Sequence, residues 1–247
     1  MKSYSTVLFD LDGVITNTAS LHAQAWKRVF DRIIECLPVP QKKFSLPKDY
    51  LNFVDGRNRI EGINAFLNHR GITAEVLPNF SSDVDLISYI AGAKNEYFLK
   101  AISQIEIPVY PDALRCLDIC LRNKYTIGLT SSSKNARYIL ERLSLLDYFD
   151  SILDGLVAEK NDIASKPNGD FYRYAAVINS TNPKNCMAIE DAISGIVSAK
   201  NAGIGVIVGV AREIPDSVLF DAGADVVVRN LDEIDFKKIS STFSCYR

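Results

Sequence analysis

Residues 4–13, YSTVLFDLDG, decide how the rest of this sequence is interpreted. The first six of them form a short apolar run that indicates a buried strand. Asp10 and Asp12 follow directly, so two carboxylates stand at the carboxyl end of that strand. Such a pair can simply cap a turn, but at the end of a buried strand it marks a candidate site.

The chain after this strand is expected to be helical for about ninety residues. Apolar residues recur at helical spacing over 18–36, and residues 57–69 and 82–104 also fit helices. Pro108 and Pro111 then mark a boundary, because the residue before a proline is disfavoured in a helix. We therefore expect a helical cap domain at residues 17–107, inserted after the first strand.

From residue 111 onward the pattern alternates between helices and short strands. The expected helices lie at 111–123, 134–144, 169–180, 192–201, 215–221 and 231–240, and the expected strands at 124–130, 151–153, 186–190, 204–208 and 225–228. Such alternation is typical of a parallel sheet covered on both faces. The predicted fold class is α/β, with a Rossmann-like core formed by residues 1–16 and 108–247.

Polar side chains follow four of the expected strands. They are Asp10 and Asp12, then the cluster Thr130, Ser131, Ser132 and Ser133, then Lys166, and finally Glu190 and Asp191. The carboxyl ends of parallel strands meet at one edge of a sheet, where ligands bind. Four carboxylates cannot all stay ionised close together without a cation, and oxygen ligands favour Mg²⁺. Asp10, Asp12, Glu190 and Asp191 are therefore the candidate metal ligands.

This set of residues can carry phosphoryl transfer. A carboxylate beside Mg²⁺ and a lysine can attack phosphorus, and a second carboxylate two residues on can move the proton. Ser131 and nearby backbone N–H groups suit a phosphate oxygen. Plainer interpretations are a helix N-cap for the serines, a solvated loop position for Lys166 and an ordinary helix start for Glu190 and Asp191.

Four motifs, in this order, resemble those of the haloacid-dehalogenase superfamily, and the likeness covers essentially the whole chain. They are Phe9-Asp10-Leu11-Asp12-Gly13-Val14, Thr130 to Asn135, Ser165-Lys166-Pro167, and Ile189 to Gly195. Within that superfamily the sequence most resembles the β-phosphoglucomutase-like group, above all over residues 10–27.

The resemblance implies a role for each matching core residue. Asp10 would be the nucleophile and a metal ligand, and Asp12 the general acid and base, with its backbone carbonyl on the metal. Glu190 and Asp191 would complete the Mg²⁺ site. The phosphate-side residues would be Ser131 and Lys166, which hold the transferring phosphoryl group, with Ser132, Lys134 and Asn135 assisting nearby.

Four cap residues also match the mutase group. Thr18 would sit at the cap hinge, and His22 would couple cap closure to proton transfer. Arg59 would grip the far phosphate of a bisphosphorylated sugar, and Lys94 would face the sugar. The alternative interpretations are a surface or packing residue for His22 and a solvated helix face for Arg59 and Lys94.

Composition limits the kinds of binding partner and the cellular location that can be expected. A net charge of −2 and a pI near 5.8 provide no basic surface for nucleic acid or an anionic membrane, and no apolar run reaches the length of a membrane span. No signal peptide is expected. The five cysteines form no CxxC, so reduced thiols and a cytoplasmic location are predicted. Cys116, Cys120 and Trp26 are interpreted as core residues.

Three functions remain open at this point. The first is a phosphomutase acting on a small phosphorylated sugar, and the second is a phosphatase that passes the phosphoryl group to water. The third is a catalytically silent sugar-phosphate sensor, which predicts loss of Asp10 or Asp12, although both are present. Nothing in the sequence requires more than a monomer.

Overall fold

The computed structural model describes residues 4–77 and 79–239, which fall into two compact units. One unit contains the chain up to Asn17 and again from Pro108 onward, and the other is Thr18–Ile107. Asn17, expected in the cap, belongs to the first unit, where its N–H donates to the carbonyl of Pro108 at 2.8 Å. This hydrogen bond connects the segment in which the chain leaves the first unit with the segment in which it returns.

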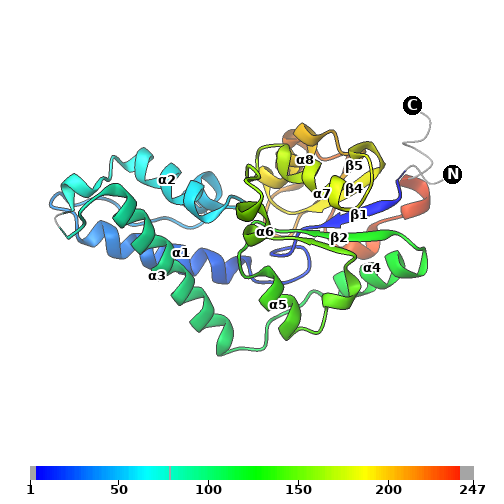
Figure 1. The fold of residues 1–247 in the computed structure, drawn as a ribbon, viewed down its shortest axis with the longest axis horizontal. Helices are drawn as coiled ribbons and strands as arrows, with labels where there is room; N and C mark the ends of the chain where they lie inside the picture. The colour runs from blue at the N-terminus through cyan, green and yellow to red at the C-terminus, as the bar shows by residue number, and fades with distance from the viewer. Residues whose placement is uncertain (1–3, 78, 240–247) are drawn as a thin grey trace. The chain divides into compact units, whose positions relative to one another are not determined.

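The first unit contains a six-stranded parallel sheet with the order β3-β2-β1-β4-β5-β6 (Figure 1). Its strands are β1 (Thr6–Phe9), β2 (Thr126–Thr130), β3 (Ser151–Leu153), β4 (Cys186–Glu190), β5 (Val206–Val210) and β6 (Val226–Val228). β1 lies between β2 and β4, with Leu8 opposite Gly128 and Ala188. The predicted α/β fold class is confirmed, and the strands that carry the candidate residues are neighbours.

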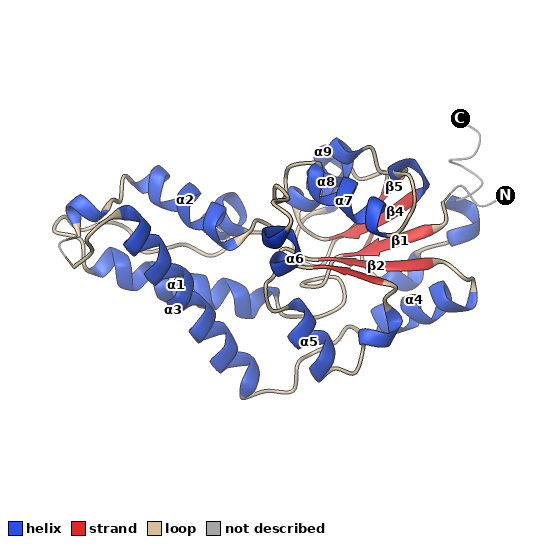
Figure 2. Cartoon of the chain, in the orientation of Figure 1, coloured by secondary structure: helices blue, strands red, loops and turns tan. Residues whose placement is uncertain are grey.

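Helices cover both faces of this sheet (Figure 2). They are α4 (Pro111–Arg122), α5 (Ala136–Arg142), α6 (Gly155–Lys160), α7 (Asp170–Ile178), α8 (Ile193–Ala202) and α9 (Asp216–Ala222). In the view of Figure 2, α4 and α5 lie on one side of the sheet and α7, α8 and α9 on the other. All residues of β1, β4 and β5 are buried, as expected for parallel strands with both faces covered.

Several expectations differ from the structure. β2 begins at Thr126 and β5 at Val206, each two residues later than predicted, and α5 is shorter than predicted at both ends. The helix expected over 231–240 is interrupted, because Asn230 caps the 3₁₀ turn η5 (Leu231–Glu233) and Asp235 then accepts from the N–H groups of residues 237 and 238. A second helical segment runs from residue 236 to 239, and residue 240 lies outside the described part of the chain. The short helix α6 was not predicted.

The interior of the first unit is apolar. Phe171 and Tyr172 of α7 and Ile196 of α8 pack against Leu8 of β1 in one cluster. Cys116 and Cys120 of α4 are buried, which confirms their interpretation as core residues, and Cys36, Cys116, Cys120 and Cys186 are free thiols. Cys245 lies outside the described residues. No helix within residues 4–77 and 79–239 combines the length and the apolar character needed to cross a membrane.

The second unit is helical. Its elements are α1 (Ala19–Glu35), the π-helical turn η1 (Tyr50–Val54), α2 (Arg59–Arg70), the 3₁₀ turn η2 (Ala74–Val76) and α3 (Asp83–Ser103). Aromatic rings form its centre: Phe30 lies 4.2 Å from Phe66 and stacks on Trp26 at 5.2 Å, measured between ring centroids. Trp26 is 5% exposed, which confirms its interpretation as a core residue.

The proline-rich segment 38–50 is tied to the helices of this unit by polar contacts. Arg70 at the end of α2 donates to the Asp49 carboxylate at 2.9 Å, and the Ser45 N–H donates to the same oxygen at 3.0 Å. Both Arg70 and Asp49 are largely buried. The segment is therefore held as a fixed part of the cap unit.

Candidate active site

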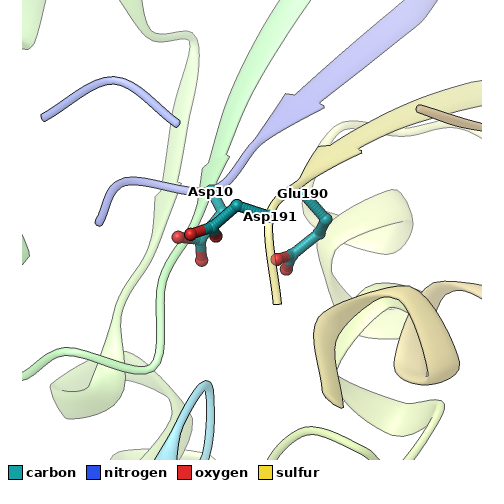
Figure 3. Close-up of side chains that lie close together, drawn as sticks. All are labelled: Asp10, Glu190 and Asp191. Atoms are coloured by element: carbon teal, nitrogen blue, oxygen red, sulfur yellow. The ribbon is translucent and has the colours of Figure 1, made fainter. Parts of the chain in front are cut away.

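Three carboxylates converge at the carboxyl ends of β1 and β4 (Figure 3). Asp10 follows β1, Glu190 is the last residue of β4, and Asp191 comes next. Oxygen atoms of these three side chains all lie within 4.8 Å of one another. The side chain of Asp12, expected as a fourth carboxylate of this group, is not part of it. The contact of its backbone carbonyl with a metal, implied by the resemblance, stays a prediction.

Lys166 lies between two of these carboxylates. Its ammonium donates to Asp10 Oδ1 at 2.7 Å, to Glu190 Oε1 at 2.5 Å and to the carbonyl of Thr130 at 2.9 Å. An ammonium has three donors, so all of them are used. Lys166 is 1% exposed, and the alternative of a solvated loop lysine is therefore wrong.

Sequence reasoning missed one residue of this site. Tyr172 of α7 is fully buried, and its hydroxyl donates to Glu190 Oε1 at 2.7 Å. The Lys166 ammonium lies 5.4 Å from the centre of the Tyr172 ring and 5.5 Å from that of Phe171, within the range of a cation–π contact. The only signal in the sequence was a tyrosine on the apolar face of the helix after Lys166, and that position is equally typical of packing.

Two glycines make room for the carboxylates. A Cβ atom at Gly13, where φ is +94°, would lie 1.8 Å from Asp191 Oδ2. A Cβ atom at Gly195 would lie 2.1 Å from Glu190 Oε1. Both separations are far below any van der Waals contact, so each carboxylate fills the space that a side chain would need. The motif glycines are thus part of the construction of the acidic group.

The surroundings set the protonation of the site. Burial raises the pKa of Asp10, the Lys166 ammonium opposes this, and the charges of Glu190 and Asp12 add to it, so that the pKa reaches about 8 without a metal. For Lys166, burial lowers the pKa, but the charges of Asp10 and Glu190 outweigh it and the pKa is raised. Burial and the charge of Glu190 raise the pKa of Tyr172 well above its usual value, so its hydroxyl stays a donor.

The donor set fits a hard divalent cation. Among the described residues, Glu190 Oε2 is buried and has no hydrogen-bond partner, which is costly for a carboxylate oxygen unless a cation or water meets it. Asp10 and Asp191 place further oxygens nearby, and all three donors are carboxylates, as Mg²⁺ prefers. A bound dication would also favour the ionised form of Asp10.

The serine loop after β2 is closed by hydroxyl-to-backbone hydrogen bonds. Ser131 is 1% exposed, and its Oγ accepts from the N–H of Ser133 at 3.1 Å. Ser133 Oγ accepts in turn from the N–H of Asn135 at 3.2 Å. Helix α5 begins at Ala136 with Asn135 as its N-cap, so the expectation that the serines themselves cap the helix is wrong. Ser132 lies in the same loop, partly exposed.

The unpredicted helix α6 packs on this loop. The Gly155 N–H donates to the carbonyl of Ser133 at 3.1 Å, and a Cβ atom at Gly155 would lie 2.6 Å from the carbonyl oxygen of Ser132. Further along α6, Glu159 accepts from the ammonium of Lys134 at 2.6 Å. Lys134, expected to assist near the phosphate, is therefore paired with a carboxylate in this structure.

Three of the predicted cap residues lie on or next to α1 and α3. Thr18 is the first residue of the cap unit, is buried and is the N-cap residue of α1. His22 Nδ1 lies 2.7 Å from the ammonium of Lys94, which is 2% exposed and lies 5.3 Å from the Trp26 ring centre. The alternative of a solvated helix face is therefore wrong for Lys94. A lysine ammonium has only donors, so Nδ1 of His22 is the acceptor of this pair.

Arg59, the fourth predicted cap residue, begins α2. Its guanidinium donates to Asn95 Oδ1 at 2.9 Å and to the carbonyl of Ala91 at 3.4 Å, both on α3. Asn58, the preceding residue, caps α2 by accepting from the Glu61 N–H. The guanidinium is thus held against α3 within the cap unit.

Comparison with known proteins places this chain in a family. The model for haloacid dehalogenase-like hydrolases matches residues 4–203. A "Beta-phosphoglucomutase" of Bacillus subtilis is 33% identical over 242 residues, covering 98% of this chain and 96% of that protein. The crystal structure of a β-phosphoglucomutase from Clostridium difficile has a TM-score of 0.78 and 27% identity, covering 98% of both chains.

The chain therefore belongs to the haloacid dehalogenase-like hydrolase family. A second relative, the "Beta-phosphoglucomutase" of Mycobacterium tuberculosis, is 32% identical over 238 residues and covers 92% of this chain and 90% of that protein. Together with the fold and the acidic group, this similarity defines an enzyme of the phosphomutase or phosphatase kind.

Proposed function

We propose that this enzyme is a Mg²⁺-dependent phosphomutase of the β-phosphoglucomutase type, acting on a small sugar phosphate through phosphorylated Asp10. The observation that carries the proposal is the buried contact of Lys166 with Asp10 and Glu190, beside an oxygen of Glu190 that lacks a hydrogen-bond partner among the described residues. Similarity to β-phosphoglucomutases over nearly the whole chain supports it.

In the first half of the reaction, a carboxylate oxygen of Asp10 attacks phosphorus and the bond from phosphorus to the leaving oxygen breaks. Bound Mg²⁺ would screen the negative charges of the carboxylate and the phosphate. Lys166 adds a fixed positive charge beside Asp10, and Ser131 with the N–H groups of its loop can bind phosphoryl oxygens. Asp12 donates a proton to the leaving oxygen.

In the second half, the phosphoryl group leaves Asp10 for an acceptor. Asp12, now ionised, takes the proton from that acceptor, as microscopic reversibility requires. In a mutase the acceptor is a second hydroxyl of the sugar, and in a phosphatase it is water. We assign recognition of the sugar phosphate to His22, Arg59 and Lys94 of the cap, whose positive and imidazole groups suit a phosphorylated sugar.

The second candidate is a sugar-phosphate phosphatase. The family match favours it as much as it favours a mutase, because the family is defined by a hydrolase model. The core residues carry out the same first half-reaction in both enzymes. The acceptor alone separates the two, so the products must be measured.

The test is a product assay with Mg²⁺, β-glucose 1-phosphate and a trace of the glucose 1,6-bisphosphate. Formation of glucose 6-phosphate without free phosphate supports the mutase. Stoichiometric release of phosphate supports the phosphatase. Absence of both products across a panel of sugar phosphates would contradict the proposal and favour the silent sensor.

The Asp10→Asn variant is the matched control, because an amide is nearly isosteric with a carboxylate but is a very weak nucleophile. We expect it to lose turnover by several orders of magnitude while its circular dichroism spectrum stays that of the wild type. If this variant retained wild-type turnover, phosphorylation of Asp10 would be refuted, whichever product is formed.

A further inference from the structure

The two carboxylate oxygens of Glu190 have different surroundings. Oε1 accepts two hydrogen bonds, from the Lys166 ammonium at 2.5 Å and from the Tyr172 hydroxyl at 2.7 Å. Oε2 is buried and has no partner among the described residues. Oε1 is thus occupied by two hydrogen bonds, whereas Oε2 can still accept a cation or a hydrogen-bond donor.

Tyr172 is fixed in place by its own packing. It is fully buried in the cluster that contains Phe171, Ile196 and Leu8. Its helix α7 starts four residues after Lys166, and the Lys166 ammonium lies 5.4 Å from the centre of its ring. The hydroxyl therefore reaches Glu190 from a rigid element, and its position does not depend on a loop.

Gly195 provides the space that the carboxylate of Glu190 occupies. The Glu190 side chain lies directly against the Gly195 backbone, where a Cβ atom would lie between 2.1 and 2.3 Å from the atoms of the carboxylate. Lys166, Tyr172 and Gly195 thus all contact the Glu190 carboxylate and together fix its position. Oε2 is the carboxylate oxygen of Glu190 without a hydrogen-bond partner among the described residues, and an oxygen of this carboxylate lies within 4.8 Å of oxygens of Asp10 and Asp191.

We propose that Tyr172 is a positioning residue for the metal site: by occupying Oε1 of Glu190, its hydroxyl keeps Oε2 available to a divalent cation. This inference rests on the proposed function, because it requires that Mg²⁺ binds at the acidic group. Tyr172 touches neither the substrate nor the reacting atoms in this role. It acts through Glu190, as donors to a ligand commonly do around protein metal sites.

The test is calorimetric titration of MgCl₂ into the metal-free enzyme, compared between wild type and Tyr172→Phe. This change removes one hydroxyl and keeps the ring over Lys166. We expect about tenfold weaker Mg²⁺ binding, the range seen when such a donor is removed. Tyr174→Phe, the same change on the same helix at a partly exposed position, is the matched control and should bind Mg²⁺ as the wild type does.

A double-mutant cycle with Glu190→Gln separates positioning from packing. If Tyr172 acts through Glu190, adding Tyr172→Phe to Glu190→Gln weakens Mg²⁺ binding by less than twofold further. Equal losses in both backgrounds would overturn the inference, and so would wild-type Mg²⁺ binding by Tyr172→Phe. Urea unfolding in EDTA, measured for each variant, identifies any that is not folded.

The results of these titrations distinguish failure of the role proposed for Tyr172 from failure of the proposed function. If the wild type binds Mg²⁺ and forms product while Tyr172→Phe binds Mg²⁺ normally, the role of Tyr172 fails alone. If the wild type binds no Mg²⁺ at the acidic group, so that Asp191→Asn changes nothing in the titration, both fail together.

Discussion

Lys166 joins Asp10, which lies 156 residues earlier in the chain, to Glu190, which lies 24 residues later. One ammonium thus balances part of the charge of two buried carboxylates. Transfer of such groups from water is costly, so each depends on the others for its place in the fold. The charge that prepares Asp10 for phosphoryl transfer in the proposed mechanism therefore also contributes to the stability of the fold.

At pH 9, where Asp10 is ionised, replacement of Lys166 by methionine should destabilise the metal-free protein by about 3–5 kcal/mol, because it leaves Asp10 and Glu190 buried without their counter-charge. Urea unfolding in EDTA measures this loss, and excess Mg²⁺ should recover part of it. The exposed Lys160 of α6 provides the control, and its change to methionine should stay within about 0.5 kcal/mol. An equally stable Lys166→Met protein in EDTA would contradict the charge balance described here.

Binding of Mg²⁺ should depend on pH through Asp10. Its pKa of about 8 in the metal-free site means that the folded protein holds a proton there at pH 7, which the metal must displace. Apparent affinity should therefore fall by up to about tenfold per pH unit below pH 8. Titration in two buffers of different ionisation enthalpy should find about one proton released at pH 7 and almost none at pH 9.5.

The same raised pKa predicts how stability changes with pH. Between the usual value of 3.8 and about 8, the folded metal-free protein binds more protons at Asp10 than the unfolded chain does. The contribution of Asp10 to the free energy of unfolding therefore decreases as pH rises through this range. Saturating Mg²⁺ should remove this decrease, and an Asp10→Asn protein should lack it.

At the scale of single residues, the sequence predicted which groups meet but not how they pair. Asp10, Glu190 and Asp191 could be named because they stand at strand ends, and Lys166 because it lies in the motif Ser165-Lys166-Pro167. The contact from Tyr172 to Glu190 could not, because it depends on the rotation of α7 against the sheet. Likewise, the pairing of Lys134 with Glu159 required a helix that was not expected.

At the scale of elements, α6 separates what the sequence can predict from what it cannot. β4 was predicted with its exact bounds, because CMAI is a continuous apolar run that is followed by two acids, Glu190 and Asp191. α6 has only six residues, too few for a helical period to stand out, and it is defined by its cap: Asp154 Oδ1 accepts from the N–H groups of Leu156 and Val157.

Glu159 on α6 should limit how freely Lys134 can reach a phosphate. Glu159→Gln releases the ammonium, so we expect a lower KM for the sugar phosphate, by less than about fivefold, because an exposed ion pair is worth under 1 kcal/mol. The difference from wild type should shrink as salt is added. Glu141→Gln on α5, also exposed, is the control. An unchanged KM at low salt would show that the pair does not restrain Lys134.

At the scale of the whole molecule, the unfolding of the two units can be measured separately. Trp26 is the single tryptophan of the chain and is buried in the cap unit. Its emission therefore reports the unfolding of the cap, whereas far-ultraviolet circular dichroism reports both units. The cap has its own aromatic core, so its stability can be changed without touching the residues around Asp10.

Acid should weaken the cap through Asp49. Burial raises the pKa of this carboxyl, but hydrogen bonds from the Ser45 N–H and from Arg70 outweigh it, and the pKa is lowered. A lowered pKa contributes stability above the usual value near 3.8, and this contribution is lost as pH falls through the folded-state value. Urea unfolding followed by Trp26 emission should detect this loss below about pH 4. Asp49→Asn should be less stable at pH 7 and should lack this part of the acid dependence, and an unchanged dependence would exclude Asp49 as its cause.

The three hydrogen bonds of Lys166 have a consequence for the catalytic cycle. Every N–H of its ammonium already has an acceptor within the protein, so an arriving phosphoryl oxygen can be bound only by exchange. In the proposed reaction, conversion of Asp10 to an acyl phosphate would remove the negative charge of its carboxylate and would weaken its oxygen as an acceptor for Lys166. Transfer of the phosphoryl group to Asp10 would therefore weaken one hydrogen bond of Lys166 and allow its ammonium to bind a phosphoryl oxygen instead.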